Sequence, residues 1–177
     1  MKKPVVYNFL KLLLGIFFVP FLALQSLASE PFKLEGVAGL EQNINFQDYA
    51  GQVILVDFWA SWCGPCRQSF PWMNAMQTKY AEQGLTIVAI NLDSEVAAAR
   101  EFLAEVPANF TLGFDPEGNS AEQMQVEAMP MSYLIDRDGR IRYRLMGFNT
   151  DKKVEHEAHI QHLLNESLLT KPRGKGL

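Results

Sequence analysis

The chain has 177 residues, a formal net charge of −4 and hydrophobic side chains at 48% of its positions. This length suits one domain with a well-developed core, and an acidic chain without a basic block is a poor match for a nucleic-acid-binding protein. Both cysteines, Cys63 and Cys66, lie in one four-residue window, so their chemistry is the central question.

The first 28 residues have the three parts of a secretory signal peptide. Three lysines give a positive start, residues 12–24 are uncharged and apolar, and residues 26–28 (SLA) offer small side chains at a cleavage site. We expect cleavage after Ala28, which removes the three lysines and leaves a domain of residues 29–177 with net charge −7. The alternative is a retained anchor, although about 13 apolar residues are fewer than the roughly 20 that usually span a bilayer. A lipid-anchored lipoprotein is excluded because no cysteine lies near this site.

Two uninterrupted apolar runs predict buried strands. Residues 53–60 (VILVDFWA) and 85–93 (LTIVAINLD) have the β-branched and aromatic composition of strands buried on both faces. Before them, residues 32–52 contain short alternating stretches separated by glycines, which predict a hairpin or a pair of short strands. A third strand of the central region is expected within residues 109–115.

Helices are predicted between these strands. Apolar residues recur at three- and four-residue spacing over residues 63–82, with Pro71 expected to kink the helix and Gly84 to end it. Residues 95–106 form the next helix, with Ser94 as its expected N-cap.

The C-terminal part predicts a short helix near residues 121–126, then a hairpin and a long helix. The stretch MSYLIDRDGRIRYRLMGF places apolar alternation on both sides of Asp138-Gly139, a strong hairpin turn signal. Residues 151–169 are amphipathic, and this succession of strands and helices predicts one α/β domain. The expected buried stripe of the last helix is Val154, Ala158, Ile160, Leu163, Leu164 and Leu168.

The cysteine pair stands where a buried strand turns into a helix (FWASWCGPCRQ). A structural staple is the weaker explanation, because a disulfide stabilises mainly by closing a loop and a C-x-x-C bridge closes almost none. At a helix N-terminus, unpaired backbone N–H groups and the helix dipole favour a Cys63 thiolate and make it nucleophilic. Pro65 suits the first helical turn. Trp59 and Trp62 are expected to shield the sulfurs and to leave one side of Cys63 open.

This arrangement predicts a two-step exchange reaction. Cys63 attacks a partner disulfide to form a mixed disulfide, and Cys66 then attacks Cys63 and releases the reduced partner. Cys66 must lose a proton in the second step, and Asp57, which stands in an apolar strand, is a candidate base, directly or through a water. Burial would raise the pKa of an isolated Asp57 carboxyl. The alternative for Asp57 is an edge position exposed to solvent.

The segment VILVDFWASWCGPCRQ resembles the active site of the thioredoxin superfamily. With the signal peptide and VEAMPMSYLIDRDGRI, the chain resembles the exported TlpA/ResA-like branch over residues 52–148. The resemblance implies a thioredoxin-like fold, in which a central mixed β-sheet is flanked by helices and both cysteines lie at the start of the first long helix. It also implies that Pro130 is a cis-proline facing the disulfide and that the Met129 backbone pairs with an extended partner segment. The implied substrate-binding residues are Trp62, Gly64, Pro65, Met129 and Pro130.

Three positions depart from family patterns. The TlpA-like branch often has a glutamate where this chain has Ser69, and an asparagine where it has Asp57. Asp57 thus takes the location of the buried acid of cytoplasmic thioredoxin, but the lysine partner of that acid aligns with Ala89. Met131 stands where dedicated cytochrome c maturation reductases often carry an acid, which weakens assignment to that subgroup.

The histidines and the C-x-x-C motif also have to be considered as metal ligands. His156, His159 and His162 recur at three-residue steps on the last predicted helix, and a solvated helix face is favoured over a metal pair. One C-x-x-C motif supplies only two of the four ligands of a zinc site. We therefore expect no metal.

These observations together predict an exported thiol–disulfide oxidoreductase that reduces partner proteins and needs no cofactor beyond its own Cys63–Cys66 disulfide. Expected partners are cysteine-containing clients, such as apocytochrome c or proteins with copper-site cysteines, and a membrane thiol–disulfide electron donor. We expect a monomer in the periplasm or another extracytoplasmic location, and the alternative is a protein that is tethered to the membrane and faces the periplasm. Three alternatives stay open: a disulfide oxidase or isomerase, a metal (copper) chaperone that uses the same cysteines, and a non-catalytic binding domain.

Overall fold

The computed structural model describes residues 32–35, 37–39 and 43–170. The predicted signal peptide, residues 1–28, and its cleavage site lie outside this part of the chain. Within the described residues, no helix combines the length and the apolar character needed to cross a membrane.

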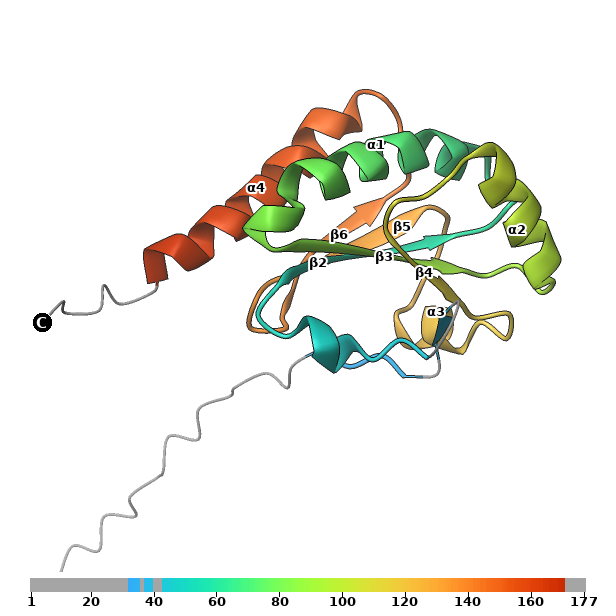
Figure 1. Ribbon diagram of the computed structural model, residues 1–177, viewed down its shortest axis with the longest axis horizontal. Helices are drawn as coiled ribbons and strands as arrows, with labels where there is room; N and C mark the ends of the chain where they lie inside the picture. The colour runs from blue at the N-terminus through green and yellow to red at the C-terminus, as the bar shows by residue number, and fades with distance from the viewer. Residues whose placement is uncertain (1–31, 36, 40–42, 171–177) are drawn as a thin grey trace, which may run out of the picture.

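The described chain folds around one mixed sheet (Figure 1). Its strands are β1 (Ala38–Gly39), β2 (Val53–Trp59), β3 (Leu85–Asn91), β4 (Thr111–Phe114), β5 (Met131–Ile135) and β6 (Ile141–Met146). They lie in the order β1-β4-β3-β2-β5-β6. The strands β2, β3 and β4 run parallel, whereas β5 pairs antiparallel with β2 and with β6, and β1 pairs antiparallel with β4.

Helices cover both faces of the sheet. They are α1 (Gly64–Tyr80), α2 (Val96–Glu105), α3 (Asn119–Gln123) and α4 (Lys152–Thr170), with the short 3-10 helices η1 (Phe46–Tyr49) and η2 (Ala81–Gln83). Figure 1 shows α1, α2 and α4 on one face and α3 with η1 on the other. This layered arrangement is the thioredoxin-like architecture predicted from the motif.

The alternation of side chains along β2 decides what lies near the cysteines. All seven residues of β2 are buried, as expected for a strand covered on both sides. Leu55 and Trp59 belong to the core cluster that also contains both cysteines and the buried residues of α1, whereas Val56 and Phe58 belong to the cluster on the opposite face. Because side chains alternate along a strand, Asp57 points to the same face as Leu55 and Trp59.

The predicted strands and helices are present, with small differences at their ends. Gly84 follows the last helical turn with φ +94°, a left-handed conformation that glycine adopts without a Cβ clash. Ser94 is not the N-cap of α2: Glu95 takes that place in an extended conformation, so the helix begins at Val96. In the N-terminal region, Ala38 pairs with Asn43 through an isolated antiparallel bridge, which confirms short extended segments there.

The buried stripe of α4 was predicted with the wrong phase at its N-terminal end. Val154 is 78% exposed and Ala158 is exposed, whereas His156 is buried. The face of α4 that packs toward α1 and the sheet therefore carries His156 and Ile160, and not Val154 and Ala158 as predicted. Three predicted members are buried, namely Ile160, Leu163 and Leu164. The side chain of Leu168 lies outside the described part.

Candidate functional site

A disulfide joins Cys63 and Cys66 at the N-terminus of α1, with 1.98 Å between the sulfurs. Cys63 is the N-cap residue, and its Sγ accepts a hydrogen bond from the backbone N–H of Cys66 at 3.2 Å. That N–H is one of the helix donors that have no partner within the helix. Pro65 occupies the first turn, where its missing N–H leaves no donor unpaired. The predicted position of the pair at a helix start is confirmed.

The residues around the disulfide differ strongly in exposure. Cys66 is fully buried and Cys63 is 5% exposed, while Gly64 and Pro65 between them are exposed. Trp59 is buried in the same cluster as the cysteines, as predicted for a shielding residue. Unlike Trp59, Trp62 is not buried: 72% of its surface is exposed, and its apolar ring faces solvent immediately before Cys63.

The loop that leads from β2 to the disulfide is held by a carboxylate that the sequence analysis missed. Asp93 is buried, and its two oxygens accept hydrogen bonds from the backbone N–H and the hydroxyl of Ser61, each at 2.9 Å. Asn91 donates a further bond to Asp93 at 2.7 Å. Asp93 is the last residue of the second predicted buried strand, and an acid at the end of that apolar run was the available signal.

Asp57 is a buried acid, and no cation among the described residues acts on its pKa. It is 1% exposed, so the alternative of an exposed edge position is wrong. Burial raises its pKa from 3.8 to about 7, and a hydrogen bond from Ser132 opposes part of this effect. The neighbour of Asp57 on β3 is Ala89, as the alignment with the thioredoxin lysine predicted, and the neighbour on β5 is Ser132. The sequence analysis did not single out Ser132, which follows the cis-proline by two residues.

The Met129–Pro130 peptide bond is cis, which confirms the cis conformation predicted for Pro130. Met131 of β5 pairs with Phe58 of β2, so Pro130 lies at the edge of the sheet where β2 ends and the cysteine loop begins. The carbonyl oxygen of Pro130 accepts a bond from Gly147 at 2.8 Å. Met129 is half-buried and packs against the cluster that contains both cysteines. The strand register thus brings this segment to the disulfide end of the sheet.

Two of the three positions that depart from family patterns, Ser69 and Met131, supply no carboxylate near the cysteines. Ser69 is buried, and its hydroxyl donates to the Cys66 carbonyl oxygen at 3.0 Å. Met131 is buried in the cluster on the opposite face of the sheet. Asp57 is therefore the candidate acid on the cysteine side of β2.

The histidines of α4 do not form the solvated face that was predicted. His156 is 5% exposed and packs edge-on against Trp72, with 5.9 Å between ring centroids, and burial lowers its pKa. His159 stacks on Tyr143 at 4.0 Å, and the Nδ1 of the exposed His162 lies 3.1 Å from the Tyr143 hydroxyl. In the described part of the chain, no three histidine, cysteine or acidic side chains are grouped to hold a metal ion.

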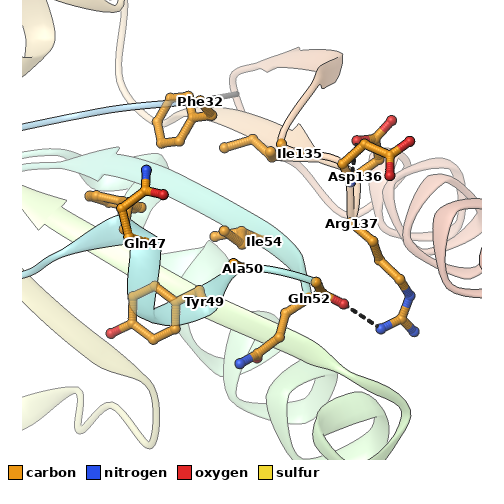
Figure 2. A pocket seen from close by; sticks show the side chains of 13 residues that line it. Phe32, Gln47, Tyr49, Ala50, Gln52, Ile54, Ile135, Asp136 and Arg137 are labelled. Carbon is orange, nitrogen blue, oxygen red and sulfur yellow. Dashed lines mark hydrogen bonds between the residues drawn. The ribbon is translucent and has the colours of Figure 1, made fainter. Parts of the chain in front are cut away.

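A pocket of about 100 Å³ lies at the other end of the sheet (Figure 2). Phe32, Tyr49 and Ile135 line it, and Arg137, whose guanidinium donates to the Gly51 carbonyl oxygen at 2.9 Å, borders it. The pocket adjoins the first residues of β2, whereas the cysteines follow its last residue. The length of β2 separates the two regions by roughly 20 Å, so this pocket is not part of the disulfide site.

The chain is similar in sequence to known proteins. Residues 26–160 match the family described as Redoxin. The thiol-disulfide oxidoreductase ResA of Bacillus thuringiensis subsp. konkukian is 31% identical over 114 residues, which are 64% of this chain and 66% of that protein. The chain therefore spans slightly less than two thirds of the length of this relative.

Solved structures agree with the fold. A protein described as the thiol:disulfide interchange protein DsbE, from Chlorobium tepidum, is 44% identical with a TM-score of 0.71, and the match covers 76% of this chain and 99% of that one. StoA from Bacillus subtilis has the same fold, with 21% identity, a TM-score of 0.58, and coverage of 72% and 95%. The chain thus belongs to the Redoxin family and is a ResA/TlpA-like member of the thioredoxin superfamily.

Proposed function

We propose that this protein is an exported thiol–disulfide oxidoreductase that reduces disulfides in partner proteins. The observation that carries the proposal is the Cys63–Cys66 disulfide at the start of α1, where Cys63 Sγ accepts the N–H of Cys66. The same hydrogen bond would stabilise a Cys63 thiolate after reduction. Relatives named thiol-disulfide oxidoreductases support this activity.

In the reduced protein, the Cys63 thiolate attacks one sulfur of a client disulfide. A bond forms between Cys63 Sγ and that sulfur, the client S–S bond breaks, and the second client sulfur leaves as a thiolate. Cys66 then attacks Cys63 Sγ, the Cys63–Cys66 bond forms, and the first client sulfur leaves. The client gains the two electrons that the dithiol loses.

Asp57 is the proposed base of the second step. Its carboxyl lies on the cysteine side of the sheet, and a pKa of about 7 lets it exchange a proton near neutral pH. The Cys66 thiol must lose its proton before it attacks Cys63. Asp57 would accept that proton, directly or through a water, and would release it to solvent before the next cycle.

The client is proposed to bind at the edge of the sheet where the cysteine loop meets the cis-proline. Exposed Trp62, Gly64 and Pro65 offer a surface beside the disulfide, and the Met129 backbone next to Pro130 offers main-chain groups for an extended client segment. A segment bound in this way would present its own disulfide to Cys63.

Export is proposed from the leader-like composition of residues 1–28. In a periplasmic compartment, free or tethered to the membrane, a reductase needs electrons from a membrane thiol–disulfide donor. Apocytochrome c and proteins with copper-site cysteines are the proposed clients, and the protein is proposed to act as a monomer.

The activity is tested by reduction of insulin disulfides with a small-molecule thiol as the electron source. Wild-type protein should accelerate the reaction, and Cys63→Ser should abolish the acceleration. Cys66→Ser should instead accumulate a covalent mixed disulfide with a client, because the resolving thiol is absent. A Cys66→Ser variant that traps no client, together with inactive wild-type protein, contradicts the proposed function.

The direction of the reaction is tested by the reduction potential of the Cys63–Cys66 pair. A value near −270 mV supports a reductase, whereas a value near −120 mV supports an oxidase. The measurement uses equilibration with a thiol–disulfide buffer and needs no client protein.

A further inference from the structure

The carboxyl of Asp57 has one hydrogen-bond partner among the described residues, and that partner is Ser132. The Ser132 hydroxyl donates to Asp57 Oδ1 at 2.5 Å. The two residues lie directly opposite each other in the β2–β5 register, so their side chains extend to the same face. On the other side of Asp57, Ala89 of β3 offers no polar group.

The two oxygens of the Asp57 carboxyl are therefore not equivalent. Oδ1 accepts the Ser132 bond, whereas Oδ2 is buried and has no hydrogen-bond partner in the described part of the chain. Leu55 and Trp59, which flank Asp57 on the same face, belong to the core cluster that contains Cys66. A carboxylate held at one oxygen thus keeps its other oxygen free of hydrogen bonds, on the face of the sheet that carries the cluster with Cys66.

We propose that Ser132 is a positioning residue, which holds Asp57 through Oδ1 so that Oδ2 exchanges the proton of Cys66. The proposal rests on the proposed thiol–disulfide exchange. In the second step, the Cys66 thiol gives its proton to Asp57 Oδ2, the Cys66–Cys63 bond forms, and the bond from Cys63 to the client sulfur breaks. The client sulfur leaves with the electron pair of the broken bond, and no other reactant is required.

Ser132 also supports the charged form of the acid without adding a charge. A hydroxyl that donates to a carboxylate stabilises the anion and lowers its proton affinity. Loss of this donor should therefore make Asp57 bind its proton more tightly. Ser132 lies on β5, two residues after the cis-proline. The Met129–Pro130 segment, which is proposed to bind the client, and Ser132, which bonds to Asp57, are therefore close together in the chain.

The first test compares wild-type protein with Ser132→Ala in two measurements. Carboxyl NMR of the oxidised protein should show Asp57 titrating about one pH unit higher in the variant. In the reduced protein, a chromogenic aromatic disulfide should report two thiol-release steps. We expect the rate of the first thiol release to stay the same in the variant. In the pH–rate profile of the second release, the acidic limb should move up by about one pH unit. At pH values below that limb, the second release should therefore be about tenfold slower than in wild-type protein.

A matched pair of substitutions separates the hydroxyl from the shape of the side chain. Ser132→Thr and Ser132→Val have nearly the same shape, both suit a strand, and only threonine keeps the donor. Threonine should restore the wild-type titration and pH profile, and valine should shift both. The pair also tests the proposal if Ser132→Ala does not fold. Ser120→Ala is the control, because it removes another hydroxyl–carboxylate bond, to Asp115, and should leave both measurements unchanged.

An unchanged Asp57 titration in Ser132→Ala and Ser132→Val overturns the proposal, and so does a threonine variant that behaves like the valine variant. The carboxyl titration needs neither a client nor turnover. Wild-type protein that fails to reduce insulin would therefore count against the proposed function, whereas the titration of Asp57 would still decide whether Ser132 controls the acid.

Discussion

At the scale of single residues, Asp57 links the stability of the fold to pH. Burial raises its pKa from 3.8 to about 7, partly offset by the Ser132 hydrogen bond. Between these two values the folded chain keeps a proton that the unfolded chain has lost, so stability falls as pH rises from about 4 to about 7. Asp57→Asn removes this dependence. We expect it to stabilise the oxidised protein by on the order of 4 kcal/mol above about pH 8, and by almost nothing near pH 4.

The measurement is the free energy of unfolding in urea at both pH values. Glu101→Gln is the matched control, since it neutralises an exposed carboxylate of α2 and should have little effect at either pH. If the stabilisation by Asp57→Asn were equal at both ends of the range, a raised pKa would not be its cause.

At the scale of elements, the parallel pair β2 and β3 explains how the disulfide loop is fixed. Parallel neighbours end at the same edge of a sheet, so the residues after β3 meet the loop that leaves β2. There Asp93 accepts two bonds from Ser61 and one from Asn91. We expect Asp93→Ala to lower the free energy of unfolding by about 3 kcal/mol, because it leaves the buried Asn91 amide and two partly buried donors of Ser61 without their partner. Hydrogen exchange of the Ser61 amide should become faster.

Ser61→Ala is the matched comparison for this prediction. It removes the hydroxyl bond to Asp93 and leaves the backbone N–H bond in place. We expect it to lower the free energy of unfolding by about 1 kcal/mol. If Asp93→Ala were no more destabilising than Ser61→Ala, the loop would be fixed by other contacts.

At the scale of the whole molecule, the features that could be predicted were those that depend on short stretches of adjacent residues. The buried runs of β2 and β3, the Asp138-Gly139 turn and the C-x-x-C motif are each contained in a few adjacent residues. The Ser132 bond to Asp57 joins residues 75 positions apart, and it depends on the register of two strands that no local pattern specifies. The error in the predicted buried face of α4 also comes from contacts between distant parts of the chain. His156 is buried because its ring packs against those of Trp72 and Phe148.

The redox state of the disulfide should change the stability of the entire fold, and the sign of the change reports the direction of catalysis. Folding and disulfide formation make a thermodynamic cycle, so a folded state that favours the disulfide is stabilised by oxidation. For the proposed reductase, we expect the oxidised protein to have the higher Tm, by roughly 5 °C, since 1 kcal/mol moves Tm by about 2–4 °C at this chain length. Thermal unfolding with and without a thiol reductant measures the difference, and the double variant Cys63→Ser/Cys66→Ser should show none. A reduced protein that is more stable than the oxidised one would reverse the assignment, because a dithiol stabilised by the fold makes its disulfide an oxidant.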